Sequence, residues 1–208
     1  MKPLIRIVDD DEALAASTAM LLESMGWETV SYTDGAKFLA EDDFTRPGCI
    51  ILDVRMPGMT GLDVQAQLEK IQVSVPILFL SAHGTIQMAV HTVHHGAVDF
   101  LEKPVDPMVL VQKVAQCVSN SVSANAEAIL LDAKKARFDE LTPRENDVVK
   151  LVLANAANKV IARELGLEVS TVKMHRANAF AKLGVHSPSE LIKLAYEVGI
   201  VDHLTEEK

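Results

Sequence analysis

The first 120 residues alternate repeatedly between a short apolar run and a longer segment whose apolar residues recur at helical spacing. Parallel strands need a long crossover connection, which is usually a helix, so this alternation predicts a parallel sheet with helices on both faces. The expected strands and helices, in chain order, are 4–8, 11–25, 27–32, 36–40, 49–53, 62–68, 76–82, 85–95, 98–101 and a helix from Pro107 onward. The predicted fold class is α/β, with a doubly wound five-stranded parallel sheet.

The pattern becomes purely helical after Thr142. Thr142, Pro143 and Glu145 together form the signature of a helix start, with a capping residue, a proline at the first helical position and a glutamate that closes a capping box. Glycines follow three of the expected helices, as helix ends prefer. The expected helices are 143–154, 158–165, 169–183 and 187–198, and the glycines are Gly166, Gly184 and Gly199. A small all-α domain therefore follows the α/β domain.

The chain has 208 residues, which is more than one typical domain of about 100 to 150 residues. We expect a first domain at 1–120, a linker at 121–137 and a second domain at 138–208. Neither glycine nor proline occurs between Met108 and Thr142. The last helix of the first domain could continue into a helical linker, or the serines and asparagines of the linker could make it a flexible tether.

Composition excludes several classes of protein. With 49% hydrophobic and 24% charged residues the chain is an ordinary globular protein, and no apolar run approaches the roughly 20 residues of a membrane-spanning helix. We therefore expect no membrane association. The two cysteines, Cys49 and Cys117, have no paired spacing, and the N-terminus turns acidic before a signal peptide could form. These features predict a cytoplasmic location.

The net charge of −9 argues against nucleic acid as a partner, but the charge is unevenly distributed. Basic residues outnumber acidic ones between 158 and 182. The basic residues there are Lys159, Arg163, Lys173, Arg176 and Lys182, against Glu164 and Glu168. A basic island in an acidic chain is a candidate nucleic-acid surface.

Polar residues follow four of the expected strands. In a parallel sheet the carboxyl ends of the strands meet at one edge, which is where open sheets of this kind bind ligands. Carboxylates gathered there repel one another unless a cation lies among them, and oxygen ligands suit Mg²⁺. The residues expected at this edge are Asp9, Asp10, Asp53, Ser81 and Lys103.

Asp53 occupies the central position, because it ends the most apolar strand and a Pro-Gly turn follows it. It is placed to attack phosphorus and to form an acyl phosphate. Mg²⁺ and Lys103 would neutralise the phosphoryl oxygens, and the Ser81 hydroxyl could hydrogen-bond to one of them.

Four motifs, "VDDDE", "LDVRMPGMTGLD", "LSAHG" and "DFLEKPVD", resemble the receiver domain of two-component response regulators over about residues 1–120. The resemblance implies Asp53 as phosphoacceptor and Mg²⁺ bound by Asp9, Asp10, Asp53 and the main-chain carbonyl of Arg55. It also implies a switch and phosphoryl-stabilising set, with a cis peptide before the proline. That set is Ser81, Phe100, Lys103 and Pro104.

Two neighbouring features have plainer interpretations. Asp11 could assist the acidic pair, but we favour it as the cap of the first helix. His91, His94 and His95 have the spacing of a transition-metal site, but no fourth ligand is in view, so we favour solvated positions on a helix.

Residues 141–195 resemble the LuxR-type helix-turn-helix domain of NarL/FixJ regulators, whose second helix enters the major groove of DNA. Val172, His175, Ala179, Phe180 and Leu183 are expected to face inward from that helix. The candidate DNA contacts are Asn158, Lys159, Ser170, Thr171, Lys173, Met174, Arg176, Ala177, Asn178 and Lys182.

The second domain departs from its family at two helix ends. Asn155 stands where a glycine is usual, and asparagine is the residue next most tolerant of left-handed geometry. Glu168 stands where a serine often caps the second helix. We therefore expect this helix to begin slightly later, capped by Ser170.

Both resemblances together predict a phosphorylation-dependent transcription regulator that is not an enzyme. Its expected partners are a sensor histidine kinase, promoter DNA, RNA polymerase and a second copy of itself after activation. Val90, Val93, His94 and Val98 are the expected dimer face, by resemblance. Two alternatives remain open. One is a regulator that binds DNA without phosphorylation, and the other is a phosphatase of the haloacid-dehalogenase type with Asp9 as nucleophile.

Overall fold

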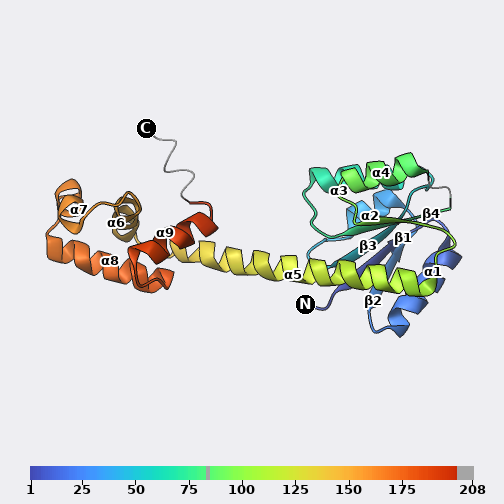
Figure 1. The fold of residues 1–208 in the computed structure, drawn as a ribbon, viewed down its shortest axis with the longest axis horizontal. Coiled ribbons are helices and arrows are strands. Elements are labelled where there is room, and N and C mark those ends of the chain that lie inside the picture. The colour runs from blue at the N-terminus through green and yellow to red at the C-terminus, as the bar shows by residue number, and fades with distance from the viewer. Residues whose placement is uncertain (83–84, 201–208) are drawn as a thin grey trace. The chain divides into compact units, whose positions relative to one another are not determined.

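The computed structural model describes residues 1–82 and 85–200, and the chain divides into two compact units, Met1–Ala126 and Glu127–Lys208. Figure 1 shows a sheet with helices in the first unit and helices in the second. Each unit has its own buried core, so the two are described separately. The predicted succession of an α/β domain and a small all-α domain is confirmed.

The first unit is built on a five-stranded parallel sheet with the strand order β2-β1-β3-β4-β5. β1 lies between β2 and β3, so the order reverses between β1 and β3, and a crevice at such a point is the usual ligand site of an open sheet. β3 is buried along its whole length. The strands are β1 (Leu4–Val8), β2 (Glu28–Tyr32), β3 (Gly48–Asp53), β4 (Ile77–Ser81) and β5 (Asp99–Glu102).

Helices cover both faces of this sheet (Figure 1). α1 and α5 pack on one face through Ala15, Leu22 and Val114, and α2 and α3 pack on the other through Phe38 and Val64. The predicted elements are all present, with ends shifted by one or two residues. The helices are α1 (Glu12–Ser24), α2 (Gly35–Glu41), α3 (Gly61–Lys70), α4 (Ile86–His94) and α5 (Pro107–Asp139).

The boundary between the two units falls within α5, and the predicted linker 121–137 is helical throughout. The domain limits at 120 and 138 themselves stay predictions. Among the described residues, no helix is both long enough and apolar enough to cross a membrane.

The second unit contains the last part of α5 and four further helices around an aliphatic core. Val148, Ile161, Val172 and Leu191 contribute one buried side chain from each of these helices. The helices are α6 (Pro143–Leu153), α7 (Asn158–Leu165), α8 (Val169–Leu183) and α9 (Pro188–Glu197).

Most local signals at the helix ends act as the sequence predicts, and one does not. The Asp11 side chain accepts a hydrogen bond from the Leu14 N–H and caps α1. Thr142 and Glu145 form the capping box that begins α6. Asn155 follows α6 with φ 59°, in the left-handed region. The expected later start of α8 is wrong: the helix begins at Val169 with Glu168 as its N-cap, although the Glu168 side chain makes no capping hydrogen bond.

Candidate phosphoacceptor site and DNA-binding helix

The parallel register brings the ends of β1 and β3 side by side, since Val8 pairs with Leu52. Asp9 follows β1 directly and Asp53 ends β3, so the two carboxylates leave the sheet at the same edge. Gly61 allows α3 to begin close to this edge, because a Cβ at Gly61 would collide with the main-chain oxygen of Asp53. The glycine in the motif after Asp53 is therefore required by this close approach.

Lys103 joins the two carboxylates. Its Nζ atom donates to Asp9 Oδ2 at 2.6 Å and to Asp53 Oδ1 at 2.8 Å. The other oxygen of each carboxylate accepts a backbone N–H, from Asp11 at 3.0 Å and from Arg55 at 2.7 Å. Asp9 and Asp53 are almost fully buried, so the structure brings together three of the predicted residues in one partly desolvated cluster.

The electrostatics of the cluster reflect this burial. Burial raises the pKa of Asp9, and the hydrogen bonds from Lys103 and from the Asp11 N–H only partly oppose it. Burial alone would lower the pKa of Lys103, but its hydrogen bonds to Asp53 and Asp9 outweigh that effect and raise it. Lys103 is therefore held as a cation between the two acids.

The oxygen atoms of this cluster suit a hard divalent ion. Each carboxylate oxygen has two lone-pair directions, so an oxygen that accepts one hydrogen bond keeps room for a cation. Asp10 is exposed beside the buried pair, and Arg55 directs its backbone N–H to Asp53 while its side chain is exposed. Within 1–82 and 85–200, no three His, Cys, Asp or Glu side chains form a ready-made metal cluster. A magnesium site here would depend on Asp9, Asp53, the exposed Asp10 and a main-chain oxygen.

The remaining switch residues flank the cluster. Ser81 ends β4 and is buried, and its carbonyl oxygen accepts the Lys103 N–H at 2.9 Å. The peptide between Lys103 and Pro104 is cis, as the resemblance implies. Phe100 is half-buried and stacks on Phe79, with ring centroids 6.3 Å apart. Phe100 has no hydroxyl, so its position depends on this packing.

The three histidines lie on and just after α4. The rings of His91 and His95 are tilted by 34° with centroids 4.4 Å apart, and His95 Nδ1 lies 3.5 Å from Glu69 Oε2. All three histidines are exposed, in agreement with the favoured interpretation.

In the second unit, α7 and α8 form the two helices of the predicted motif, joined at Gly166, which has the left-handed φ of 64°. The predicted inward face of α8 is buried except for His175, which is half-buried. The candidate DNA contacts on α8 are exposed except for Thr171, Arg176 and Lys182, which are half-buried. Met174 has 52% of its surface exposed on this helix.

Two of the predicted DNA contacts are joined to each other. Arg176 Nη1 donates to Asn158 Oδ1 at 2.9 Å, and the Arg176 guanidinium lies 5.1 Å from the centroid of the Phe180 ring. Asn158 begins α7, so Arg176 is oriented by the neighbouring helix. The sequence does not predict this link, because the two residues have no periodic relation in the chain.

Lys182 is engaged within the unit. Its Nζ atom donates to Glu145 Oε2 at 2.6 Å and to the Glu140 carbonyl at 3.1 Å. The Lys182 side chain is therefore paired with a residue of α6. It is not freely exposed in the way that Lys173 and Met174 are. Its predicted contact with DNA stays a prediction.

Comparison with known proteins identifies the family of each domain. Residues 5–115 match the response regulator receiver domain, and residues 139–195 match the luxR family of bacterial regulatory proteins. The chain belongs to the response regulators that carry a LuxR-type DNA-binding domain. It is a transcription regulator of a two-component system.

Individual relatives of the same architecture match almost the whole chain. The response regulator protein TodT of Pseudomonas putida is 37% identical over 191 residues, which are 92% of this chain and 84% of TodT. The transcriptional regulatory protein FixJ of Bradyrhizobium diazoefficiens is 35% identical over 199 residues, covering 95% and 97%.

The solved structure of the response regulator StyR has 36% sequence identity and a TM-score of 0.85, and the match covers 95% of this chain and all of StyR. The sequence also suggests a likeness to StyR in particular, and this likeness is confirmed.

Proposed function

We propose that Asp53 accepts a phosphoryl group from a sensor histidine kinase. An oxygen of Asp53 attacks the phosphorus, the bond between phosphorus and the donor breaks, and an acyl phosphate forms. The observation that carries the proposal is the hydrogen bonding of Lys103 to both Asp9 and Asp53. A buried cation fixed at the nucleophile can neutralise incoming phosphoryl oxygens.

Mg²⁺ is the proposed cofactor, held by Asp9, Asp10, Asp53 and the Arg55 carbonyl. Bound there, it would neutralise charge on the phosphoryl group. The chain's own residues contribute the nucleophile, the Lys103 cation and the Ser81 hydroxyl. Turnover of a free substrate has no part in this function, so the protein acts as a regulator and is not an enzyme.

The second unit is the proposed reader of promoter DNA. The exposed residues of α8, together with Asn158 and Lys159 of α7, would contact the major groove and the phosphate backbone. With few basic residues, one such unit binds weakly, and two units on adjacent half-sites multiply the affinity. The gain from two half-sites supports a homodimer on activation. RNA polymerase is the proposed partner in transcription.

Exposed apolar residues support the predicted dimer face. On α4, Ile86, Val90 and Val93 expose 85%, 52% and 50% of their surface, and Val98, which follows the helix, exposes 37%. Such a patch is typical of an interaction surface. The proposed domain limits are 1–120 for the receiver and 138–208 for the DNA-binding domain, and the proposed location is the cytoplasm, where free thiols such as Cys49 and Cys117 persist.

The test is to incubate the full-length chain with a small phosphodonor and Mg²⁺, and to map the modified residue by mass spectrometry. The expected result is one acyl phosphate on Asp53, lost in Asp53→Asn and accompanied in the wild type by dimerisation and tighter promoter binding. Modification of Asp9 with sustained release of phosphate would instead indicate the phosphatase. Promoter affinity and oligomeric state unaffected by Asp53→Asn would indicate a phosphorylation-independent regulator.

A further inference from the structure

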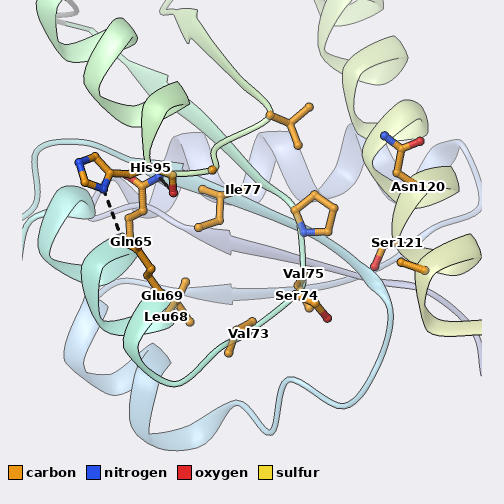
Figure 2. Close-up of a pocket in the computed structure, with 14 residues that line it drawn as sticks. Gln65, Leu68, Glu69, Val73, Ser74, Val75, Ile77, His95, Asn120 and Ser121 are labelled. Atoms are coloured by element: carbon orange, nitrogen blue, oxygen red, sulfur yellow. Dashed lines mark hydrogen bonds and ion pairs between the residues drawn. The ribbon is translucent and has the colours of Figure 1, made fainter. Parts of the chain in front are cut away.

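Gln65 is a buried polar residue of α3 that binds the end of another helix. Only 3% of its surface is exposed. Its Nε2 atom donates to the Thr92 carbonyl at 2.9 Å and to the His95 carbonyl at 3.0 Å. His95 is the C-cap residue of α4, so the Gln65 amide binds backbone carbonyls at the C-terminal end of that helix. We call these two hydrogen bonds the Gln65 clasp, and Figure 2 shows Gln65 beside His95.

Packing alone does not hold Gln65 in this position. The side chain lines a cavity of about 410 Å³ that also borders Leu68, Val75, Ile77 and Ser121 (Figure 2). Free space therefore lies beside the side chain. Burying an amide is favourable only if it is hydrogen-bonded, so the two carbonyls of α4 keep it in place.

The rest of α4 is less buried, although Met88 packs partly against the core. Among the described residues of α4, Thr92 is the buried one, and it lies within the clasped end. Ile86 in the first turn is exposed. The capping hydrogen bond from the Met88 N–H to Thr85 lies within this end of the helix, so it does not attach the helix to another element. The contact between His95 Nδ1 and Glu69 Oε2 is 3.5 Å long and largely exposed, so it adds little to the attachment.

We propose that Gln65 is a positioning residue that fixes the C-terminal end of α4 to α3, so that α4 responds to phosphorylation by pivoting about the clasp. This proposal rests on the proposed function, in which Asp53 is phosphorylated and α4 forms part of the dimer face. Ser81 ends β4 only four residues before Thr85. A change at Ser81 therefore reaches the N-terminal end of α4 first.

A fixed end makes the helix act as a lever. Ile86–His94 spans about 12 Å at 1.5 Å per residue, so a displacement at the first turn is carried along the exposed positions of Val90 and Val93. If the far end were free, the same displacement could be absorbed by fraying of the last turn. The clasp thus couples the change at Ser81 to the dimer face.

The clasp itself can be tested without phosphorylation. Gln65→Met keeps a similar volume and removes the two donors, and Gln67→Met is a matched control because Gln67 is exposed on the same helix. Hydrogen exchange of the full-length chain should become at least fivefold faster at the amides of His95, Gly96 and Ala97 in Gln65→Met, and stay unchanged in Gln67→Met. Equal exchange in wild type and Gln65→Met would overturn the proposal.

The coupling is tested by the dimer dissociation constant, measured by sedimentation with and without a small phosphodonor and Mg²⁺. The dissociation constant without phosphodonor, divided by that with phosphodonor, measures the response to phosphorylation. This ratio should be at least fivefold smaller in Gln65→Met than in the wild type, while the amount of acyl phosphate on Asp53 stays at the wild-type level. Val75→Ala controls for lost stability, because Val75 lines the same cavity but makes no part of the clasp. It should keep the wild-type ratio.

The outcomes separate the two proposals. If the wild type forms no acyl phosphate on Asp53, or forms it without dimerising, the proposed function fails. If the wild type responds and Gln65→Met responds equally, or if Val75→Ala loses the response as well, the pivot is wrong and the proposed function stands.

Discussion

The ammonium of Lys103 lies 2.8 Å from an oxygen of Asp53, although 50 residues separate the two in the chain. Both side chains are mostly buried, with 15% of Lys103 and 7% of Asp53 exposed. A buried lysine shared by two acids is a fixed positive charge at the place where we propose that Mg²⁺ and a phosphoryl group bind. Its charge must therefore influence both.

Replacing Lys103 with methionine should tighten Mg²⁺ binding. The lysine cation competes with the metal for the oxygens of Asp9 and Asp53, so its removal leaves two buried carboxylates without a counter-charge. We expect about a fivefold to tenfold lower dissociation constant for Mg²⁺, measured by calorimetry. Lys113→Met is the control, because Lys113 pairs with Asp99 and not with these acids. Unchanged or weaker Mg²⁺ binding in Lys103→Met would contradict the proposed ligand set.

Glu145 should stabilise the second unit in a pH-dependent way. Its hydrogen bond from Lys182 and those from Thr142 lower the pKa of this carboxyl below the ordinary value of 4.5. A lowered pKa contributes stability above about pH 4.5, and that contribution is lost as the pH falls through the lower pKa of the folded state. Glu145→Gln should therefore cost about 1 kcal/mol at neutral pH and make unfolding less sensitive to acid.

The measurement is urea unfolding of the full-length chain by circular dichroism at several pH values, with hydrogen exchange of α6 and α8 to assign the effect to the second unit. Glu164→Gln, an exposed position on α7, should behave as wild type. If Glu145→Gln unfolds with the same acid sensitivity as the wild type, the ion pair between Glu145 and Lys182 does not contribute to stability.

Asp42 should raise the pKa of Tyr32. Burial, together with the charge of Asp42 and the hydrogen bond that the Tyr32 hydroxyl donates to it, raises the pKa of Tyr32 to about 12. Because the folded pKa lies above the unfolded value of 10, this stability is present below pH 10 and is lost as the pH rises from 10 towards 12. Asp42→Asn removes the charge, so the phenol should ionise at lower pH.

Asp42 is also the partner of the fully buried Arg6, whose Nε lies 2.8 Å from Asp42 Oδ2. Arg6 Nη2 is buried without a hydrogen-bond partner among the described residues, so Arg6 depends strongly on this one carboxylate. Asp42→Asn should therefore destabilise the first unit by about 3 kcal/mol. Ultraviolet titration in a Tyr196→Phe background isolates Tyr32, and Asp43→Asn, which is exposed, should shift neither the titration nor the stability.

Replacement of Lys173 should weaken DNA binding alone, whereas replacement of Arg176 should weaken DNA binding and lower thermal stability. Lys173→Ala removes an exposed charge from α8, so promoter binding should weaken about tenfold, with a salt dependence reduced by about one ion and no change in thermal stability. Arg176→Ala should weaken binding and also lower the melting temperature, because it loses Asn158 and the Phe180 ring. Fluorescence anisotropy at several salt concentrations and thermal unfolding measure both effects.

The control for this pair is Lys193→Ala, since Lys193 is an exposed lysine of α9. It should leave promoter binding and its salt dependence close to wild type. Equal loss of affinity in Lys193→Ala and Lys173→Ala would mean that binding follows total charge and not the face of α8.

The grouping of the residues at the carboxyl ends of the strands was predictable from the sequence. Asp9, Asp53, Ser81 and Lys103 each follow or end an apolar strand, and parallel strands deliver their ends to one edge, so spacing along the chain was enough to group them. The inward positions of α8 were predictable for a similar reason, because helical periodicity sets them. The start of α8 was not, because Glu168 occupies the N-cap position without its side chain making a capping hydrogen bond.

The sequence by itself determined the two domain types, the order of their elements, the helix caps at Asp11 and Thr142, and the acids and lysine of the candidate phosphoacceptor site. Only the tertiary structure decided that Lys182 pairs with Glu145, that Arg176 binds Asn158, and that Gln65 holds the end of α4. These pairs join residues that lie 18 to 37 positions apart, on different helices or at their ends, with no common period. Local periodicity predicts which face a residue lies on, whereas such partners are chosen by how the helices pack.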